Sequence, residues 1–187
     1  MNIGFIGTGL MGSPMIKNLL KSKHKISIFN RTISKAKKLK KYGAYLSYKI
    51  EELVKDKEII ITMLTDDKAV NNIIRSKTFL NNVCKQTTVI DMSSTKPSTA
   101  LDNYKILKKR GVYFLDAPVS GGTKGAESAS LAIMVGGEKK IYKKNLKVLK
   151  MLGIPNYVGK PSSGQAAKLA NQTVSYTHLR AHETCPY

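Results

Sequence analysis

Asn-Ile-Gly-Phe-Ile-Gly-Thr-Gly-Leu-Met-Gly at residues 2–12 is the stretch that decides the fold, because a short apolar run leads directly into a G-x-G-x-x-G motif. Residues 11–21 follow with helical spacing, so the motif lies between a predicted strand and a predicted helix. In that setting Gly7 allows a tight turn, Gly9 lets the backbone approach a pyrophosphate, and Gly12 lets the helix lie close to the strand. The N–H groups at the start of the helix then face the phosphates. The stretch therefore predicts a dinucleotide site, with a purely structural turn as the alternative.

Beyond the motif, the chain alternates between short β-branched runs and helical segments. The runs lack a strict apolar–polar alternation, as expected for strands of a parallel sheet that is covered on both faces. The pattern predicts an α/β fold of the Rossmann type, with a doubly wound, mostly parallel sheet and right-handed crossovers. The predicted strands are Asn2–Ile6, Lys25–Phe29, Ala44–Leu46, Glu58–Met63, Thr88–Asp91, Val112–Ala117, Leu131–Val135 and Tyr157–Val158. The predicted helices are Met11–Lys21, Ile33–Lys41, Ile50–Lys55, Asp67–Arg75, Ser98–Arg110, Lys139–Leu152 and one that starts near Gly164.

The formal net charge of +20 over 187 residues raises the question of a nucleic-acid partner. The lysines are scattered, however, and those between 139 and 150 lie opposite an apolar stripe that contains Ile141, Val148 and Leu149. This arrangement is typical of the solvated face of an amphipathic helix. The sequence therefore does not favour a nucleic-acid partner, although the charge can attract anionic ligands such as NADP and carboxylate substrates.

Composition also bears on the compartment. Hydrophobic residues make up 42% of the chain, as in ordinary globular proteins. The longest apolar run, Ile59–Leu64, is too short to cross a membrane, and the first residues lack the basic start of a secretory signal. Cys84 and Cys185 lie far apart, without the C-x-x-C spacing, which suits a reducing environment. We therefore expect a cytoplasmic protein with no membrane partner.

The second predicted strand ends at Phe29-Asn30-Arg31-Thr32, where an NAD site usually places an Asp or Glu for the ribose 2′-hydroxyl. This chain has no acid there. Asn30 can bond a hydroxyl, Arg31 can bind a 2′-phosphate through its fork of donors, and Thr32 can cap the next helix. The segment favours NADP over NAD as the cofactor. Arg31 as an ordinary surface charge is the alternative.

Two later segments carry polar groups suited to a substrate. Residues 116–126 read Asp-Ala-Pro-Val-Ser-Gly-Gly-Thr-Lys-Gly-Ala and are typical of a loop, in which the N–H groups of 120–122 can form a concavity for an anion. Plain turn chemistry explains this composition equally well. In the predicted helix from Gly164, Lys168 and Asn171 are three residues apart and share one face. A lysine in that position can donate a proton to a carbonyl oxygen, while an exposed surface lysine is the alternative.

Taken together, these segments resemble the β-hydroxyacid dehydrogenase family, which includes 3-hydroxyisobutyrate dehydrogenase, tartronate semialdehyde reductase and glyoxylate/succinic semialdehyde reductases. The resemblance runs in order from Asn2 to about Thr173. It is carried by GFIGTGLMG at 4–12, ITMLTDD at 61–67, IDMSST at 90–95, DAPVSGGTKGA at 116–126, LAIMVGG at 131–137 and GQAAKLANQ at 164–172. One departure is Thr65, where the family often has proline.

The resemblance implies roles at the matching positions. Lys168 would be the general acid in reduction, and Asn171 would orient substrate and lysine. Ser120, Gly121 and Gly122 would bind the substrate carboxylate. The cofactor would be held by Gly7, Gly9, Leu10, Met11 and Gly12 at its pyrophosphate, by Asn30, Arg31 and Thr32 at its adenosine ribose, and by Met63, Leu64 and Thr95 toward its nicotinamide.

The activity implied by the resemblance is hydride transfer between NADP and a small 3-hydroxyacid or semialdehyde, with a small carboxylate-bearing substrate. Lys168 argues against imine reductases, and residues 169–172 lack the histidine usual in 6-phosphogluconate dehydrogenases. The alternative is a non-catalytic protein that uses the same fold to bind NADP or nucleic acid. No metal is expected.

The resemblance stops after Thr173, where the family continues into an all-helical domain. We therefore expect an NADP-binding domain at 1–160, the start of the interdomain helix of a truncated helical domain at 161–173, and a non-native tail at 174–187. His178, His182 and Cys185 in that tail have the residue types of zinc ligands, but a foreign segment explains them without a metal. We expect this polypeptide to be inactive alone, because the helical domain would complete the substrate pocket and form the interface of a homo-oligomer.

Overall fold

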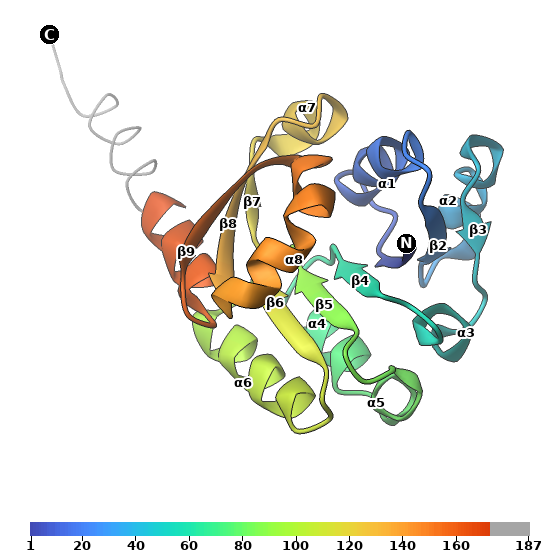
Figure 1. Ribbon diagram of the computed structural model, residues 1–187. Coiled ribbons are helices and arrows are strands. Elements are labelled where there is room, and N and C mark those ends of the chain that lie inside the picture. Colours follow the sequence, from blue (N-terminus) through green and yellow to red (C-terminus); the bar gives the residue numbers. More distant parts are fainter. Residues whose placement is uncertain (173–187) are drawn as a thin grey trace, which may run out of the picture.

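A single nine-stranded sheet organises residues 1–172, the part of the chain that the computed structural model describes (Figure 1). The strands run in the order β3-β2-β1-β4-β5-β6-β8-β7, and β9 pairs with β8. Every pairing from β3 to β6 is parallel, whereas β8 runs antiparallel to both β6 and β7. The strands are β1 (Asn2–Ile6), β2 (Lys25–Phe29), β3 (Tyr45–Leu46), β4 (Ile59–Thr62), β5 (Thr88–Asp91), β6 (Tyr113–Asp116), β7 (Val119–Ser120), β8 (Leu131–Gly137) and β9 (Gly153–Gly159).

Helices cover both faces of the sheet. One apolar cluster contains buried residues of α1, α2, α7 and α8, and a second contains those of α3, α4, α5 and α6. The expected doubly wound, mostly parallel Rossmann-type fold is therefore confirmed. The helices are α1 (Gly12–Leu20), α2 (Ile33–Lys37), α3 (Ile50–Val54), α4 (Asp67–Ile74), α5 (Lys77–Asn82), α6 (Pro97–Lys108), α7 (Gly122–Glu127) and α8 (Lys139–Lys150), with a 3-10 turn η1 (Lys40–Tyr42).

Strand β1 contributes buried side chains to the apolar clusters on both faces of the sheet. Ile3 and Phe5 are fully buried in the cluster with α1, while Ile6 is buried in the opposite cluster. Gly4 shares the side of Ile6, and a side chain there would press on Leu53 of α3 at 3.0 Å. The small residue lets α3 pack against the middle of the sheet. Side chains on both faces of β1 are thus buried in the core. This packing fixes the orientation of the strand and of the glycine turn that follows it.

Three elements lie where the sequence predicted none. Helix α5 carries one fully buried apolar side chain, Phe79, and starts at Ser76, whose hydroxyl accepts from the Phe79 N–H. Such a short helix leaves no apolar periodicity to detect. Strand β7 and helix α7 occupy residues predicted as a loop, so that prediction was wrong. The predicted helix 33–41 also breaks into α2 and η1 before Gly43, which has a φ of +97°.

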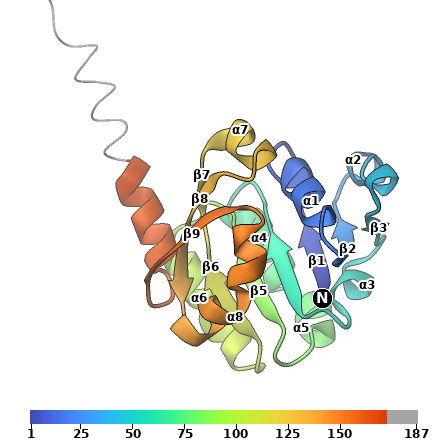
Figure 2. The same ribbon diagram turned by 45° about the horizontal axis from the view of Figure 1, so that its top comes forward.

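The C-terminal part of the described chain is a helix over 163–172. It follows β9, and Figures 1 and 2 both place it at the β9 side of the sheet, opposite to β3. Within residues 1–172, no helix combines the length and apolar character that a membrane span requires. The tail at 174–187, with His178, His182 and Cys185, lies outside the described residues.

Candidate functional site

The glycine turn after β1 is built around two backbone approaches that exclude any side chain. Gly7 has a φ of +106°, and a Cβ atom there would collide with the Met63 carbonyl oxygen. A Cβ atom at Gly12 would collide with the Gly7 carbonyl oxygen and lie 3.3 Å from the Phe5 ring. At Gly9, in contrast, no heavy atom of the described part of the chain lies within 4 Å of the missing Cβ. Gly9 therefore borders open space, which is where the motif would hold a pyrophosphate.

Asn30 ties this turn to the end of β2. Its Oδ1 accepts from the Thr8 N–H at 3.0 Å, and its Nδ2 donates to the Thr32 carbonyl at 2.9 Å. The sequence predicted a bond from Asn30 to a ribose hydroxyl; the side chain serves first as a bridge between two loops of the protein. Thr32 stands at the start of α2, but its side chain makes no capping bond, so that part of the prediction was wrong.

A cavity of about 310 Å³ opens beside the turn, at the carboxyl ends of β1, β2 and β4. In an open parallel sheet this edge is where ligands bind. Arg31 is exposed at its rim. Of the predicted cofactor residues, the cavity brings together Gly7, Gly9, Asn30, Arg31, Thr32, Met63 and Leu64. Leu10 is 84% exposed and borders a different cavity, Met11 packs against the core, and Gly12 is buried.

The residues predicted for substrate and catalysis lie elsewhere. Among the described residues that line the cavity, none is Ser120, Gly121, Gly122, Lys168 or Asn171, and the predicted cofactor residue Thr95 is not among them either. Ser120 belongs to β7 and pairs with Ala132 of β8, Gly121 precedes α7 with a φ of +126°, and Gly122 begins that helix. Helix α7 is held against α1, since the Asn18 Nδ2 donates to the Ala126 carbonyl at 2.7 Å. Helix α7, which begins at Gly122, is thus attached to α1, the helix that follows the glycine turn.

Gln165 is a buried residue that the sequence left without a role. Its Oε1 accepts from the Thr95 N–H at 3.0 Å, and its Nε2 donates to the Ser93 carbonyl at 2.7 Å. The Ser93 hydroxyl in turn accepts from the Leu64 N–H at 2.9 Å. This chain of bonds fixes the helix over 163–172 to the loops that follow β4 and β5. The position of Lys168 is thereby linked to the rim of the cavity at Leu64.

Asp116 holds the N-terminal end of the same helix. The carboxylate accepts from the N–H groups of Ser162 at 2.9 Å and Gln165 at 3.0 Å, so it caps the start of the helix. Gly164 leaves the space this requires, because a side chain there would collide with backbone oxygens of Met134 and Asp116. Asp116 was quoted in the sequence motif, but its partners are backbone groups more than 40 residues away, which no local pattern reveals.

Lys168 lies one turn beyond this anchor. The side chain is half-buried, and burial lowers the pKa of its ammonium group from the usual value. Among residues 1–172, no hydrogen bond or ion pair is formed by this ammonium group. Asn171, three residues on, is exposed. A lysine that is partly desolvated and unpaired exchanges its proton more readily than a surface lysine, as proton transfer requires.

Asp91 and Asp116 are expected to make the fold lose stability as the pH rises. Burial raises the pKa of each carboxyl from 3.8 to about 6, and Asp91 Oδ2 has no hydrogen-bond partner among residues 1–172. Between these values the native state holds more protons than the unfolded chain, so the free energy of unfolding is highest below pH ~4 and falls through pH ~6. Each carboxyl contributes up to ~3 kcal/mol to that fall. Urea unfolding from pH 4 to 7 should show a shallower fall for Asp91→Asn than for the wild type, and equal slopes would contradict the assignment.

In residues 1–172, no three side chains of the His, Cys, Asp and Glu types gather in a way that could hold a metal ion. The candidate site is made of backbone N–H groups, amides, the Arg31 guanidinium and two lysines, of which Lys35 lines the cavity and Lys168 lies outside it.

Comparison with known proteins adds to this geometry. Residues 2–170 match the family model described as the NAD binding domain of 6-phosphogluconate dehydrogenase. 2-(Hydroxymethyl)glutarate dehydrogenase from Eubacterium barkeri is 37% identical over 173 residues, which cover 91% of this chain and 58% of that protein. Mitochondrial 3-hydroxyisobutyrate dehydrogenase from Drosophila melanogaster is 39% identical over 171 residues, which cover 91% of this chain and 52% of that protein.

Solved structures give the same relationship. Mycobacterium tuberculosis 3-hydroxyisobutyrate dehydrogenase with L-serine superposes with a TM-score of 0.89 at 32% identity, covering 92% of this chain and 59% of that one. The chain thus spans between 52% and 59% of the length of these three relatives, and it matches their N-terminal portion.

Proposed function

The chain belongs to the β-hydroxyacid dehydrogenase family, and from this premise we propose that it binds NADP and serves in hydride transfer to or from a small 3-hydroxyacid or semialdehyde. The observation that carries the proposal is the glycine turn with its cavity at the carboxyl edge of β1, β2 and β4. Titration of the protein with NADPH, followed by the change in nicotinamide fluorescence, tests it directly. The absence of saturable binding would contradict it.

In the proposed site, three groups of residues would each bind a different part of the cofactor. The open space at Gly9 fits a pyrophosphate that receives bonds from the first N–H groups of α1, with Leu10, Met11 and Gly12 shaping the turn. Asn30, Arg31 and Thr32 would hold the adenosine ribose at the end of β2. Met63, Leu64 and Thr95 would line the way to the nicotinamide. When bound, the nicotinamide supplies the hydride acceptor or donor.

The substrate part rests on Lys168. In the proposed reduction this ammonium donates a proton to the carbonyl oxygen, and in oxidation the neutral amine accepts the hydroxyl proton. Asn171 would orient the substrate and the lysine. Ser120, Gly121 and Gly122 would bind a carboxylate, which agrees with the acids named in the relatives from Eubacterium barkeri and Drosophila melanogaster.

We further propose that residues 1–160 form the cofactor-binding domain and that 161–173 begin an interdomain helix. The helical part of the relatives would then complete the substrate pocket and the interface of a cytoplasmic homo-oligomer. On this proposal the 187-residue chain binds NADP but turns over little substrate.

Arg31→Ala is expected to weaken NADPH binding at least tenfold and to leave NADH binding nearly unchanged, because only NADPH offers the 2′-phosphate to the guanidinium. Dissociation constants of both cofactors for wild type and variant check this. Lys23→Ala removes the same charge from an exposed position in the turn before β2, and should change neither constant. If both variants weakened NADPH equally, general charge would explain the preference; if wild type bound NADH more tightly, the choice of NADP would be wrong.

A further inference from the structure

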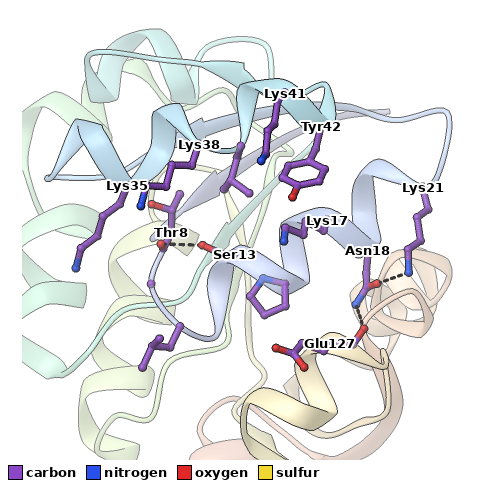
Figure 3. A pocket seen from close by; sticks show the side chains of 14 residues that line it. Thr8, Ser13, Lys17, Asn18, Lys21, Lys35, Lys38, Lys41, Tyr42 and Glu127 are labelled. Carbon is purple, nitrogen blue, oxygen red and sulfur yellow. Dashed lines mark hydrogen bonds between the residues drawn. The ribbon is translucent and has the colours of Figure 1, made fainter.

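A second, larger cavity of about 710 Å³ lies on the other side of the glycine turn. Figure 3 shows it between α1 on one side and α2 with η1 on the other, with Glu127 of α7 at one end. A wall is formed by Ser13 and Lys17 of α1 together with Lys21, which caps the C-terminus of that helix. We call the cavity of about 310 Å³ at the carboxyl ends of β1, β2 and β4 the dinucleotide cleft. The larger cavity shares Gly9 and Lys35 with that cleft, and its other lining residues are different.

Among the described residues, five lysines and one carboxylate line this cavity. They are Lys17, Lys21, Lys35, Lys38 and Lys41, and the carboxylate is Glu127. In the part of the chain that the structure describes, none of these lysines forms a salt bridge. Lys21 is bonded to the Asn18 Oδ1 at 2.8 Å, an uncharged partner. The cavity therefore concentrates positive charge that the protein does not neutralise, and concave charged surfaces focus their field on an incoming ligand.

Tyr42 brings two of these charges together. The Lys17 and Lys41 Nζ atoms lie 4.6 Å and 5.3 Å from the centre of the same ring. Each cation is attracted to the ring, but the two repel one another. An anion placed between them would relieve this repulsion. The ring thus positions two ammonium groups for one multiply charged ligand.

Thr8 contributes a buried hydroxyl group to the lining of the cavity. The residue is 3% exposed and lines the cavity, and its Oγ1 has no hydrogen-bond partner within the described residues. Its backbone groups are both engaged, since the N–H donates to Asn30 and the carbonyl accepts from the Ser13 hydroxyl at 2.9 Å. Buried hydroxyls are nearly always paired in folded proteins. A ligand oxygen would satisfy this one.

We propose that this cavity, the lysine groove, binds a compact oligophosphate, either inorganic or carried by a nucleoside. Its volume exceeds the needs of a single phosphate, and its donors are ammonium groups and a hydroxyl, which suit several linked phosphates. Because Thr8 and Gly9 belong to the glycine turn, an oligophosphate in the groove would contact the same loop as the dinucleotide. The proposal stands on the groove alone and does not depend on hydride transfer.

Isothermal titration with tripolyphosphate at 0.15 M salt tests the proposal. The variant Lys17→Gln/Lys38→Gln/Lys41→Gln should bind tripolyphosphate at least tenfold more weakly than the wild type. The control variant Lys140→Gln/Lys143→Gln/Lys147→Gln loses the same charge from the exposed face of α8 and should bind within twofold of the wild type. Thr8→Val, which removes only the unpaired hydroxyl, should weaken binding several-fold, with the fold checked by circular dichroism.

Three results would overturn the proposal: no tripolyphosphate binding to the wild type, an equal loss in the two triple variants, or a greater loss in Arg31→Ala than in the groove variant. The last would place the phosphates in the dinucleotide cleft. Comparison with ATP distinguishes the source of the phosphates. Equal affinities for ATP and tripolyphosphate support an inorganic ligand, and an ATP affinity at least tenfold higher supports a nucleotide. Since NADPH binding is measured separately, the groove and the proposed cofactor site can fail independently.

Discussion

Gly12→Ala is expected to lower the free energy of unfolding by about 3 kcal/mol and to abolish NADPH binding. The added methyl group would collide with the Gly7 carbonyl oxygen and crowd the Phe5 ring at 3.3 Å. The colliding atom belongs to the backbone of the turn itself, so relief requires α1 to move away from β1. That movement would carry the first N–H groups of the helix away from the pyrophosphate position. Urea unfolding and NADPH titration of the same preparation measure both effects.

Gly9→Ala provides the matched control, because it adds the same methyl group two residues from Gly7 in the same turn. No atom of residues 1–172 outside the immediate chain neighbours lies within 4 Å of the position the methyl would take, so the free energy of unfolding should change little. The methyl would nevertheless occupy the open space assigned to the pyrophosphate, and NADPH affinity should fall at least tenfold. A Gly9→Ala protein with normal NADPH binding would show that the cofactor does not cross this turn.

Lys168→Ala is expected to reduce turnover by roughly 10²- to 10⁴-fold, the range typical of losing a general acid–base group. Because the chain spans 58% of the Eubacterium barkeri relative, the assay calls for a chimera that adds the C-terminal part of that dehydrogenase. The dissociation constant for NADPH should be unchanged, since no proposed cofactor contact is lost. The loss should therefore appear in kcat rather than in cofactor affinity.

Two further variants separate the role of the proton from that of the charge. Lys168→Arg keeps the positive charge but cannot release a proton near neutral pH, so it should remain nearly as slow as Lys168→Ala. Lys160→Ala removes an exposed lysine just before the same helix and should retain near-normal turnover. If Lys168→Ala retained near-normal turnover in the chimera, the lysine would lose its assigned role.

The parts of the fold that the sequence predicts well are those with local causes. Strands β1, β2 and β5 appear with the expected bounds, because β-branched runs and the glycine motif mark them directly. Helix α7 is missed, because residues 122–127 contain two glycines and bury only Gly125 and Ala126. Its position depends on the contact between Asn18 and the Ala126 carbonyl, which joins residues 108 apart.

The candidate site divides in the same way. Residues at the carboxyl ends of β1 and β2 could be grouped from the sequence, because parallel strands bring loop starts to one edge, whereas Met63 and Leu64 after β4 were assigned through the family resemblance. Gln165 could not be given a role in this way, since its partners are backbone groups of Ser93 and Thr95, about 70 residues earlier in the chain. A side chain that pairs with distant main-chain atoms leaves no complementary residue type to search for.

The double attachment of Asn30 has a consequence for protein engineering. Exchange of the preferred coenzyme in nucleotide-binding enzymes often begins with a new acid at the end of the second strand. With Asn30→Asp, the carboxylate would still accept from the Thr8 N–H. The Asn30 Nδ2 that now donates to the Thr32 carbonyl would, however, be replaced by an oxygen, and two oxygens would repel one another there. The substitution would therefore disturb the backbone on which the intended ligand rests, and a redesign for NADH would do better to leave Asn30 in place and vary Arg31 alone.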